Sequence, residues 1–460
     1  MSAGALYFAP QAWVDGRWQS EVLMRVDERG HWAAVQAGQA CPPEAVRLAG
    51  PVLPSLVDAH SHAFQRAFAG LAEQRDSDSD DFWSWRDRMY GVALRITPAQ
   101  LQAIAAQLYL ELLRGGYTQV CEFHYLQHPA DGSAYPDELA MSWALADAAA
   151  EAGLGLTMLP VLYAHAGFAQ PALREDQRRF RTDADWVWHA SQRLNAAGRP
   201  LLNAGVALHS LRAAHAADIR ALQARVGDTD LPIHVHISEQ QAEVRDCLAA
   251  TGRRPMAYLC EDFQPDARWH LVHATHSTPE EIAAVAASGA SAVICPTTEA
   301  NLGDGLCDLR GWLAAGVPLS LGSDSHVGRG WVEELRWLEY GQRLGLQQRN
   351  VAAQPGVQAS TAARLFEAVR RGSAAPAGLR QWGLEVGARA DFLVLDPAAS
   401  GLRGLPAAAT LDGLVFASQG EVLQSVYVAG QRRLHQGQHE RQGVIGERFE
   451  AAMAALWRKT

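Results

Sequence analysis

The middle of the chain alternates short apolar runs, rich in β-branched residues, with longer segments of helical periodicity. Eight of the runs have the length and composition of buried strands: Val52–His60, Tyr117–Phe123, Leu154–Leu162, Asn203–His209, Leu231–Ile237, Trp269–His273, Ala290–Cys295 and Pro318–Asp324. Strands that alternate with helices predict a parallel sheet, and eight such units predict an α/β fold of the closed (β/α)8 TIM barrel type. The alternative is an open doubly wound sheet, but no glycine fingerprint follows the first strand.

Both ends of the chain carry strand patterns of a different kind. Residues 5–50 contain short strands with hairpin turn signals such as Asp15-Gly16, and strands also occur near 390–397 and 425–431. We therefore expect a small β-sandwich-like domain built from both termini, residues 1–50 and 385–445. The barrel would occupy residues 51–384, and a C-terminal helix residues 446–460. A length of 460 residues accommodates a barrel of about 250 residues with such additions.

Composition excludes several functions. Hydrophobic residues make up 48% of the chain and charged residues 20%, as in a globular protein. Fifty acidic against forty basic residues give a net charge of −10, which argues against binding to nucleic acid or to anionic membranes. The only lysine is Lys459, so lysine-based chemistry is excluded from an internal active site.

The cysteines and the N-terminal residues bear on the cellular location of the protein. The cysteines form no C-x-x-C pair, so we expect reduced thiols: Cys41, Cys121, Cys247, Cys260, Cys295 and Cys307. Residues 1–7 lack the pattern of a secretory signal. The longest stretch without charged residues, 152–173, contains glycines and prolines typical of a strand and its loop, not of a membrane span. We expect a soluble cytoplasmic protein.

Residues suited to metal chemistry occur at the ends of four predicted strands. They are His60 and His62 on the first, His234 and His236 on the fifth, His273 on the sixth and Asp324 on the eighth. Residues two apart on a strand share a face, so His60 and His62 can reach one point. Imidazoles with one carboxylate suit zinc, which lowers the pKa of a bound water. Because His234 and His236 also share a face, spacing does not choose between them.

A purely structural interpretation of these histidines is the alternative. The chain has 17 histidines, and a single H-x-H pair on a strand is more often structural than a ligand. The candidates, however, all fall at the same end of separately predicted strands, which is where a barrel places its active site. This shared placement favours a metal site.

The order His60-x-His62, His236-x-x-Glu239, His273 and Asp324 resembles the amidohydrolase superfamily, specifically its mononuclear deaminase branch. Further stretches resemble the deiminases of that branch that act on N-formimino-L-glutamate: residues 60–73, 82–86, 122–125, 208–212, 297–304 and 322–326. Binuclear members of the superfamily resemble one another in bridging two metals with a carbamylated lysine, which this chain lacks at that position.

The resemblance implies one Zn²⁺ ion per subunit, held by His60, His62, His236 and Asp324. It implies a homodimer that hydrolyses N-formimino-L-glutamate to N-formyl-L-glutamate and ammonia, by attack of a metal-bound hydroxide, in histidine degradation.

The implied catalytic residues are Glu239, His273 and Asp324. We expect Glu239 to carry a proton from the attacking water to the leaving nitrogen. His273 would steady the tetrahedral intermediate, and Asp324 would accept the proton of the water besides binding the metal.

The substrate of this implied reaction is a small dicarboxylate, which an acidic protein must hold with local positive charge. The arginine fork matches a carboxylate at two points, so Arg86 and Arg212 are the candidates, with Tyr125 and His209 as further donors. Gln65, just after the metal motif, is positioned to contact the formimino group. Arg86 has a structural alternative as a charge on a helix surface.

Two other functions are compatible with parts of this pattern. A purine or pyrimidine deaminase of the same branch would be favoured by aromatic and amide groups in the pocket, whereas paired arginines favour a dicarboxylate. A non-catalytic barrel that serves as a scaffold would be expected to lack some metal ligands, and this chain has all of them.

Overall fold

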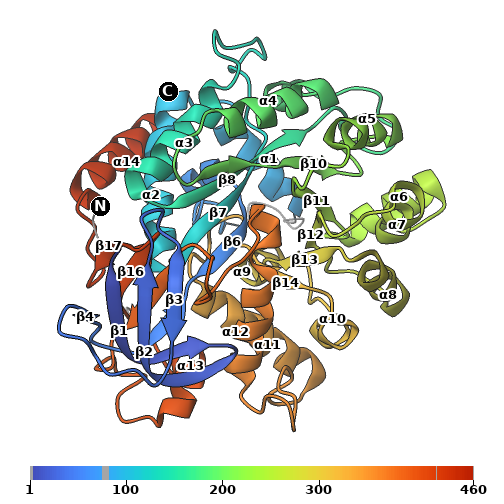
Figure 1. The fold of residues 1–460 in the computed structure, drawn as a ribbon. Helices are drawn as coiled ribbons and strands as arrows, with labels where there is room; N and C mark the ends of the chain where they lie inside the picture. Colours follow the sequence, from blue (N-terminus) through green and yellow to red (C-terminus); the bar gives the residue numbers. More distant parts are fainter. Residues whose placement is uncertain (1–3, 75–81, 421, 459–460) are drawn as a thin grey trace.

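A closed barrel of parallel strands lies at the centre of the computed structural model, which describes residues 4–74, 82–420 and 422–458 (Figure 1). The strands follow the order β10-β11-β12-β13-β14-β6-β7-β8, and pairing of β8 with β10 closes the ring. Their bounds are β6 (Leu56–Ser61), β7 (Tyr117–His124), β8 (Gly155–Leu162), β10 (Val206–Ser210), β11 (Ile233–Ile237), β12 (Trp269–His273), β13 (Ser291–Ile294) and β14 (Leu319–Leu321). The short strand β9 (Leu202–Ala204) pairs with β8 outside the ring. The predicted α/β barrel is confirmed.

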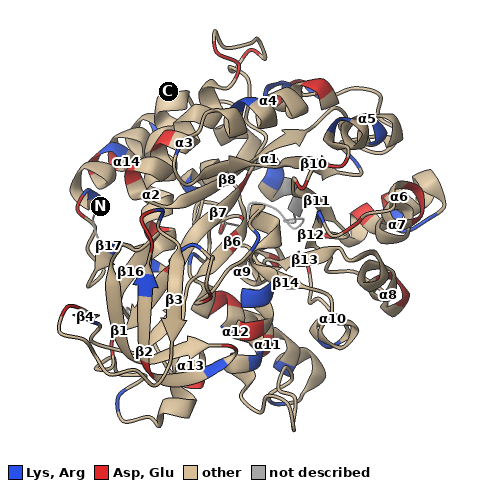
Figure 2. Cartoon of the chain, in the orientation of Figure 1, with Lys and Arg blue, Asp and Glu red and all other residues tan. Residues whose placement is uncertain are grey.

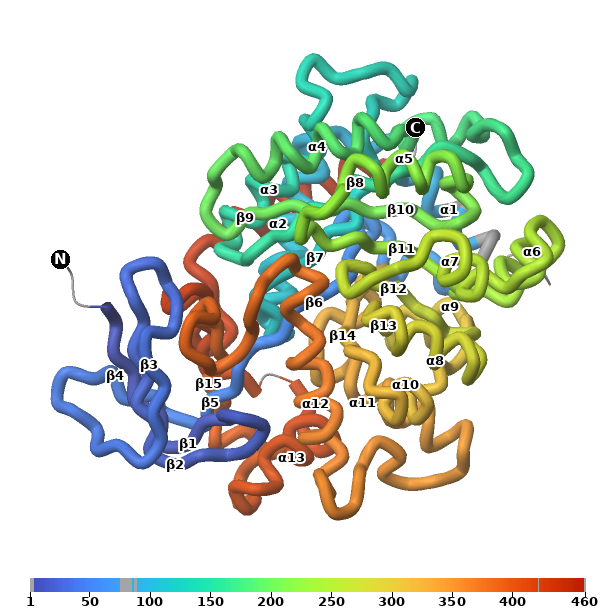
Figure 3. Tube along the Cα trace, turned by 45° about the vertical axis from the view of Figure 1, so that its right-hand side comes forward, coloured from blue at the N-terminus to red at the C-terminus, as the bar shows by residue number. Residues whose placement is uncertain are grey.

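Helices cover the outside of the barrel (Figures 1 and 3). They are α1 (Phe82–Ala93), α2 (Pro98–Arg114), α3 (Ala140–Ala152), α4 (Ala184–Ala196), α5 (Ala216–Val226), α6 (Gln241–Thr251), α7 (Pro255–Phe263), α8 (Pro279–Ser288), α9 (Pro296–Leu302), α10 (Leu309–Ala315), α11 (Trp331–Leu346), α12 (Thr361–Gly372), α13 (Thr410–Phe416) and α14 (Gln442–Trp457). Short 3₁₀ turns are η1 (Ala63–Ala67), η2 (Glu175–Phe180), η3 (Ala375–Ala377) and η4 (Ala407–Ala409).

Local sequence sets where several of these helices begin. Thr278 caps α8, because its hydroxyl accepts a hydrogen bond from the backbone N–H of Glu281. In return, the Glu281 carboxylate accepts a hydrogen bond from the backbone N–H of Thr278. Pro279 follows at the first helical position, where a missing N–H costs nothing. Helix α2 begins in the same way at Thr97 and Pro98.

The strands at the two ends of the chain form one further sheet, beside the barrel (Figure 3). Its order is β17-β16-β15-β5-β1-β2-β3, with β4 paired to β1. The bounds are β1 (Leu6–Val14), β2 (Arg17–Val26), β3 (Trp32–Gln36), β4 (Val46–Arg47), β5 (Val52–Pro54), β15 (Phe392–Leu395), β16 (Leu423–Val428) and β17 (Gln431–His435). A sheet unit assembled from both termini is thus what the strand patterns predicted.

The predicted first strand, Val52–His60, is wrong as one element. Its beginning, β5, pairs with β1 and β15 in the terminal sheet, and only its continuation, β6, enters the barrel. Ser55 lies between the two and accepts a hydrogen bond on its carbonyl from Trp382 Nε1 at 2.7 Å. An uninterrupted apolar run indicates burial on both faces, but it does not say which sheet each half joins.

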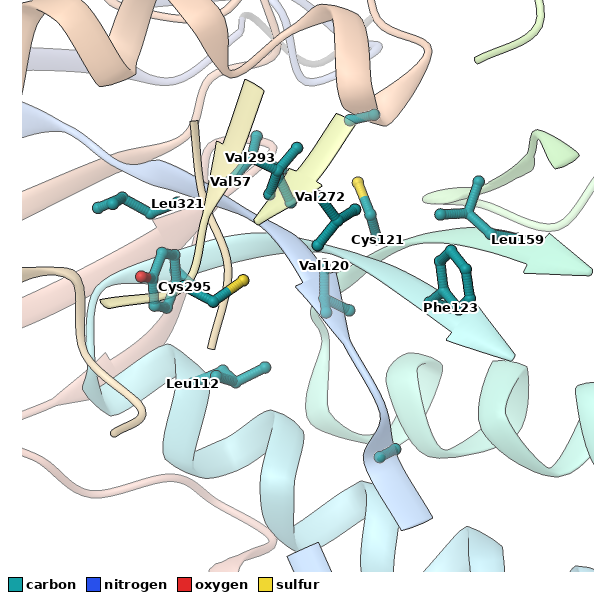
Figure 4. Packing of buried hydrophobic residues seen from close by; sticks show 14 of the residues in the cluster. Val57, Leu112, Val120, Cys121, Phe123, Leu159, Val272, Val293, Cys295 and Leu321 are labelled. Atoms are coloured by element: carbon teal, nitrogen blue, oxygen red, sulfur yellow. The ribbon is translucent and has the colours of Figure 1, made fainter. Parts of the chain in front are cut away.

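The core fills the space inside the barrel and between the barrel and its helices. Figure 4 shows side chains from several strands and from α2 packed there: Val57, Leu112, Val120, Cys121, Phe123, Leu159, Val272, Val293, Cys295 and Leu321. Charged residues lie mostly on the surrounding helices and loops (Figure 2). None of the helices in the described ranges is long and apolar enough to cross a membrane.

The turn η3 lies across the amino ends of the barrel strands. Pro376 O accepts hydrogen bonds from His234 Nε2 at 2.9 Å and from Cys121 Sγ at 3.3 Å. Ala377 O accepts from Thr157 Oγ1 at 2.9 Å. At this end of the barrel a backbone segment therefore accepts hydrogen bonds from side chains of three strands.

Candidate metal and active site

Three donor atoms, from three places in the barrel, lie around the Nε2 atom of His60. Its Nε2 lies 3.1 Å from His62 Nε2, 2.9 Å from His236 Nε2 and 3.5 Å from Asp324 Oδ1. His62 Nε2 lies 3.4 Å from the same Asp324 oxygen. All four side chains are buried. The structure therefore brings together the four residues that the resemblance implied as ligands.

For His62 and His236, the second ring nitrogen shows which way the imidazole faces. His62 Nδ1 lies 2.9 Å from Phe123 O, and His236 Nδ1 lies 2.9 Å from His209 O. A carbonyl oxygen only accepts, so each Nδ1 carries the proton and each Nε2 presents a lone pair to the cluster. Burial lowers the pKa of both rings, and the neutral form is the one that binds a cation. The arrangement is therefore suited to hold a metal ion.

A buried hydrogen-bond network ties together the two strand ends that carry His60 and Asp324. Asp58, on β6, accepts from Ser323 N at 2.9 Å and from Ser323 Oγ at 2.5 Å. His326 Nδ1 lies 3.1 Å from the same Ser323 hydroxyl. Burial raises the pKa of Asp58 to about 7. These contacts hold in place the two backbone segments that carry His60 and Asp324.

Glu122 supports the neighbouring loop in the same way. Its carboxylate accepts from Ser61 Oγ at 2.8 Å and from the backbone N–H of Ala63 at 2.6 Å. These two residues flank His62, so the loop that carries this imidazole is held from β7. Burial raises the pKa of Glu122 to about 8.

The backbone at the carboxyl ends of three strands is strained. Ser238, His273, Asp324 and His326 have φ values of 52°, 70°, 49° and 65°, in the left-handed region that residues with a Cβ seldom adopt. Such conformations cost about 1–3 kcal/mol each and persist where the surroundings enforce them, most often at functional sites.

One cavity joins the metal donor set to the other predicted residues. The predicted site residues that line it are His62, Gln65, Arg86, Tyr125, His209, Arg212, His236, Glu239, His273 and Asp324. His60 lies beneath them, with none of its surface exposed. Arg86 lines this cavity from α1, so it is not an outward-facing helix charge.

Glu239 and His273 lie next to the donor set. His273 Nε2 is 3.8 Å from both Glu239 Oε1 and Asp324 Oδ2. Burial raises the pKa of Glu239. For His273 burial favours the neutral ring, but the carboxylates of Glu239, Glu299 and Asp324 outweigh it and raise the pKa to about 10. The pair can hold and transfer protons beside the metal donors.

The remaining lining residues offer hydrogen-bond donors and acceptors. Gln65 donates through Nε2 to Tyr125 Oη at 3.2 Å, while its buried Oε1 has no hydrogen-bond partner in the described part of the chain. Burial would lower the pKa of Arg212, but the carboxylates of Glu243 and Glu239 outweigh it and raise that pKa. Burial lowers the pKa of His209, which leaves a neutral ring.

Sequence reasoning missed several residues of this site. Tyr163 lines the cavity, accepts from Gln177 Nε2 at 3.0 Å and packs against His209 with ring centroids 4.3 Å apart. It directly follows the predicted third strand, and that position was a signal that could have identified it. Glu299 lies within 297–304, a stretch that carried the family resemblance, but nothing in the spacing showed that it contacts His273.

The chain matches the model of the amidohydrolase family over residues 52–433 and belongs to that family. The resemblance seen in the sequence is thereby confirmed. Among curated proteins it is 45% identical over 436 residues to a formimidoylglutamate deiminase from Pseudomonas aeruginosa, covering 94% of this chain and 95% of the relative. It is 26% identical over 345 residues to a 5-methylthioadenosine/S-adenosylhomocysteine deaminase from Halobacterium salinarum, covering 75% of this chain and 73% of that protein.

Solved structures show the same fold. An amidohydrolase from Brucella melitensis superposes with a TM-score of 0.93 at 39% identity, covering 98% of this chain and 99% of that one. An adenosine deaminase from Xanthomonas campestris with bound zinc superposes with a TM-score of 0.80 at 22% identity, covering 99% of this chain and 98% of that one. The second likeness concerns the fold alone.

Proposed function

We propose that this chain hydrolyses N-formimino-L-glutamate to N-formyl-L-glutamate and ammonia, a step of histidine degradation. The relative from Pseudomonas aeruginosa, similar over nearly the whole of both chains, supports this reaction. The observation that carries the proposal is that Arg86 and Arg212 line the same cavity as the metal donor set. Two guanidinium groups suit a ligand with two carboxylates.

One zinc ion per subunit, held by His60, His62, His236 and Asp324, would supply a water whose pKa is lowered toward neutrality. In support, His60 shares one triad of donor atoms with His62 and Asp324 and a second with His236 and His273, and within each triad all atoms lie within 4.8 Å of one another. Zinc–nitrogen bonds of about 2.0–2.1 Å place tetrahedral donors roughly 3.3 Å apart. The closest separations between donor atoms here run from 2.9 to 3.5 Å.

The reaction requires a proton to move from the attacking water to the nitrogen that leaves. Water adds to the formimino carbon, the bond from that carbon to its terminal nitrogen breaks, and this nitrogen departs as ammonia. Glu239 is the group for this transfer, because its raised pKa suits a carboxyl that must both accept and donate near neutral pH. Asp324, besides holding the metal, can accept the first proton of the water. His273, protonated, stabilises the negative charge that develops on the attacking oxygen.

The other lining residues hold the substrate in our proposal. Gln65 Oε1, which has no hydrogen-bond partner among the described residues, accepts a hydrogen bond from a formimino N–H. Arg86 and Arg212 bind the carboxylates, and Tyr125 and His209 contribute further polar contacts. Together they place the formimino carbon over the metal donors.

A purine-type deaminase is the second candidate, favoured by the aromatic rings of Tyr90, Tyr125 and Tyr163 in the cavity. Purified protein incubated with N-formimino-L-glutamate, and separately with adenosine, distinguishes the two. We expect ammonia and N-formylglutamate from the first and no ammonia from the second. Formamide in place of ammonia would mean that the other C–N bond breaks, and ammonia from adenosine alone would favour the second candidate.

Metal analysis before and after zinc supplementation tests the scaffold alternative, which predicts no bound metal.

We also propose that the enzyme is a cytoplasmic homodimer. The net charge of −10 and the absence of a membrane-spanning helix in the described ranges agree with a protein that binds neither nucleic acid nor membranes. Light scattering on the purified protein measures the number of chains, and fractionation of cells that express it tests the location.

A further inference from the structure

Glu299 lies directly behind His273, on the side away from the metal donors. Helix α9 begins at Pro296, just after β13, and holds Glu299 with only 4% of its surface exposed. One carboxylate oxygen, Oε1, accepts the backbone N–H of Cys295 at 2.9 Å and lies 3.4 Å from His273 Nδ1. A single oxygen thus joins the end of β13 to the imidazole at the end of β12.

The backbone around Glu299 keeps that oxygen in place. Its own N–H donates to Cys295 O at 2.9 Å, and its carbonyl accepts from Asp304 N at 2.9 Å. The side chain therefore forms a closed ring of contacts with the residue that begins its helix, and Oε1 has little freedom to move. It is a fixed acceptor and not a mobile counter-charge.

His273 needs such a support. Its φ of 70° is in the left-handed region, a strained conformation that persists only where the surroundings enforce it. An acceptor at Nδ1 holds the ring by the proton on that nitrogen, so that Nε2 faces the cavity, 3.8 Å from Glu239 Oε1 and from Asp324 Oδ2.

We propose that Glu299 is a positioning residue that fixes the orientation of the His273 ring through the location of its Oε1 atom, a role that does not depend on its negative charge. This rests on the proposed function, in which His273 stabilises the developing oxyanion. No role for Glu299 follows from the sequence spacing or from the metal donor set.

Two substitutions separate position from charge. Glu299→Gln keeps an oxygen acceptor at the same place but removes the charge. Glu299→Asp keeps the charge but withdraws the oxygen by about one bond length, roughly 1.5 Å, beyond hydrogen-bond reach of Nδ1. We expect kcat for N-formimino-L-glutamate to fall about 10- to 100-fold in Glu299→Asp, with KM within about twofold and zinc content unchanged, and to stay within about threefold of the parent in Glu299→Gln. Equal loss in both variants, or no loss in Glu299→Asp, would overturn the proposal.

A readout independent of turnover separates this inference from the proposed function. In protein labelled with ¹⁵N-histidine, the His273 Nδ1 proton is assigned by its absence in His273→Ala. We expect a protected resonance in the parent and in Glu299→Gln, and its loss in Glu299→Asp. If the parent protein releases no ammonia from N-formimino-L-glutamate, the proposed function fails. The resonance still tests whether Glu299 holds the His273 ring.

A double variant and a control complete the test. In His273→Ala, adding Glu299→Asp should lower kcat no further, and an additive loss would mean that Glu299 does not act through His273. Glu339→Asp is the matched control, because Glu339, on α11, is also buried and its carboxylate also accepts backbone N–H groups, those of Val351 and Ala352. Its kcat should remain within about twofold of the parent, and a loss as large as that of Glu299→Asp would overturn the assignment to His273.

Discussion

His234 and His236 lie two residues apart on the same strand, β11, yet their side chains serve opposite ends of the barrel. His234 Nε2 lies 2.9 Å from Pro376 O, in the turn across the amino ends of the strands. His236 Nε2 lies 2.9 Å from His60 Nε2, in the metal donor set. Two residues along a strand span about 6.6 Å, which is enough to separate a structural histidine from a ligand on one inward face.

This relationship predicts opposite effects for two otherwise matched substitutions. His236→Ala should lose the metal and the activity, because one of four donors is removed. His234→Ala should keep about one zinc per chain but lose roughly 2–4 kcal/mol of unfolding free energy, since a buried hydrogen bond disappears and a cavity is left. Metal analysis and urea unfolding of both variants measure this. Loss of zinc in His234→Ala alone would reverse the assignment.

The substrate proposal predicts that Arg212→Ala lowers kcat/KM for N-formimino-L-glutamate while zinc content stays unchanged. Loss of charge-assisted bonds to a carboxylate costs about 2–5 kcal/mol, or a fall of roughly thirtyfold or more. Arg212→Lys keeps the charge but not the two-point geometry, so its kcat/KM should lie between those of the parent and Arg212→Ala. Arg220, exposed on α5 over the Phe263 ring, supplies the control, and Arg220→Ala should not change kcat/KM. An unchanged kcat/KM in Arg212→Ala would defeat the assignment of this residue.

The network behind Asp324 predicts a loss of metal affinity without loss of a ligand. In Ser323→Ala the hydroxyl contacts to Asp58 and His326 disappear, so the Asp324 segment is less firmly held. We expect zinc affinity to fall about 10- to 100-fold, as measured by competition with chelators of graded strength. Ser320, on β14 three residues earlier, is also buried, and its Oγ has no hydrogen-bond partner within the described residues. Ser320→Ala should therefore retain the parent affinity, and equal losses in both variants would argue against the network.

The free cysteines predict a reactivity that depends steeply on pH. Cys260 is half-buried, and burial raises the pKa of its thiol to about 11. At pH 8 only about 0.1% of such a thiol is the reactive thiolate. Modification by a disulfide reagent, taken as the difference between the parent and Cys260→Ser, should therefore be slow at pH 8 and rise about tenfold per pH unit up to pH 10. A rapid, pH-independent reaction would contradict the raised pKa.

Much of the barrel could be predicted from the sequence because its strands are buried on both faces. A strand with two buried faces is rich in apolar residues, and Trp269–His273 is found with the predicted bounds. The same pattern cannot say where the chain passes from one sheet to another. Val52–His60 is one apolar run in the sequence but two strands in the structure, because the terminal sheet and the barrel both bury their residues.

The amino-acid sequence by itself determined the kind of chemistry, since strand ends in a barrel share one face and the donor residues follow the strands. Only the tertiary structure decided which atoms meet. His60 and His236 are 176 residues apart and come together through closure of the barrel. The choice between His234 and His236 depends on a turn near residue 376, and the support of His273 depends on Glu299. Periodicity records which side of an element is buried, whereas a contact between distant segments depends on how whole elements pack.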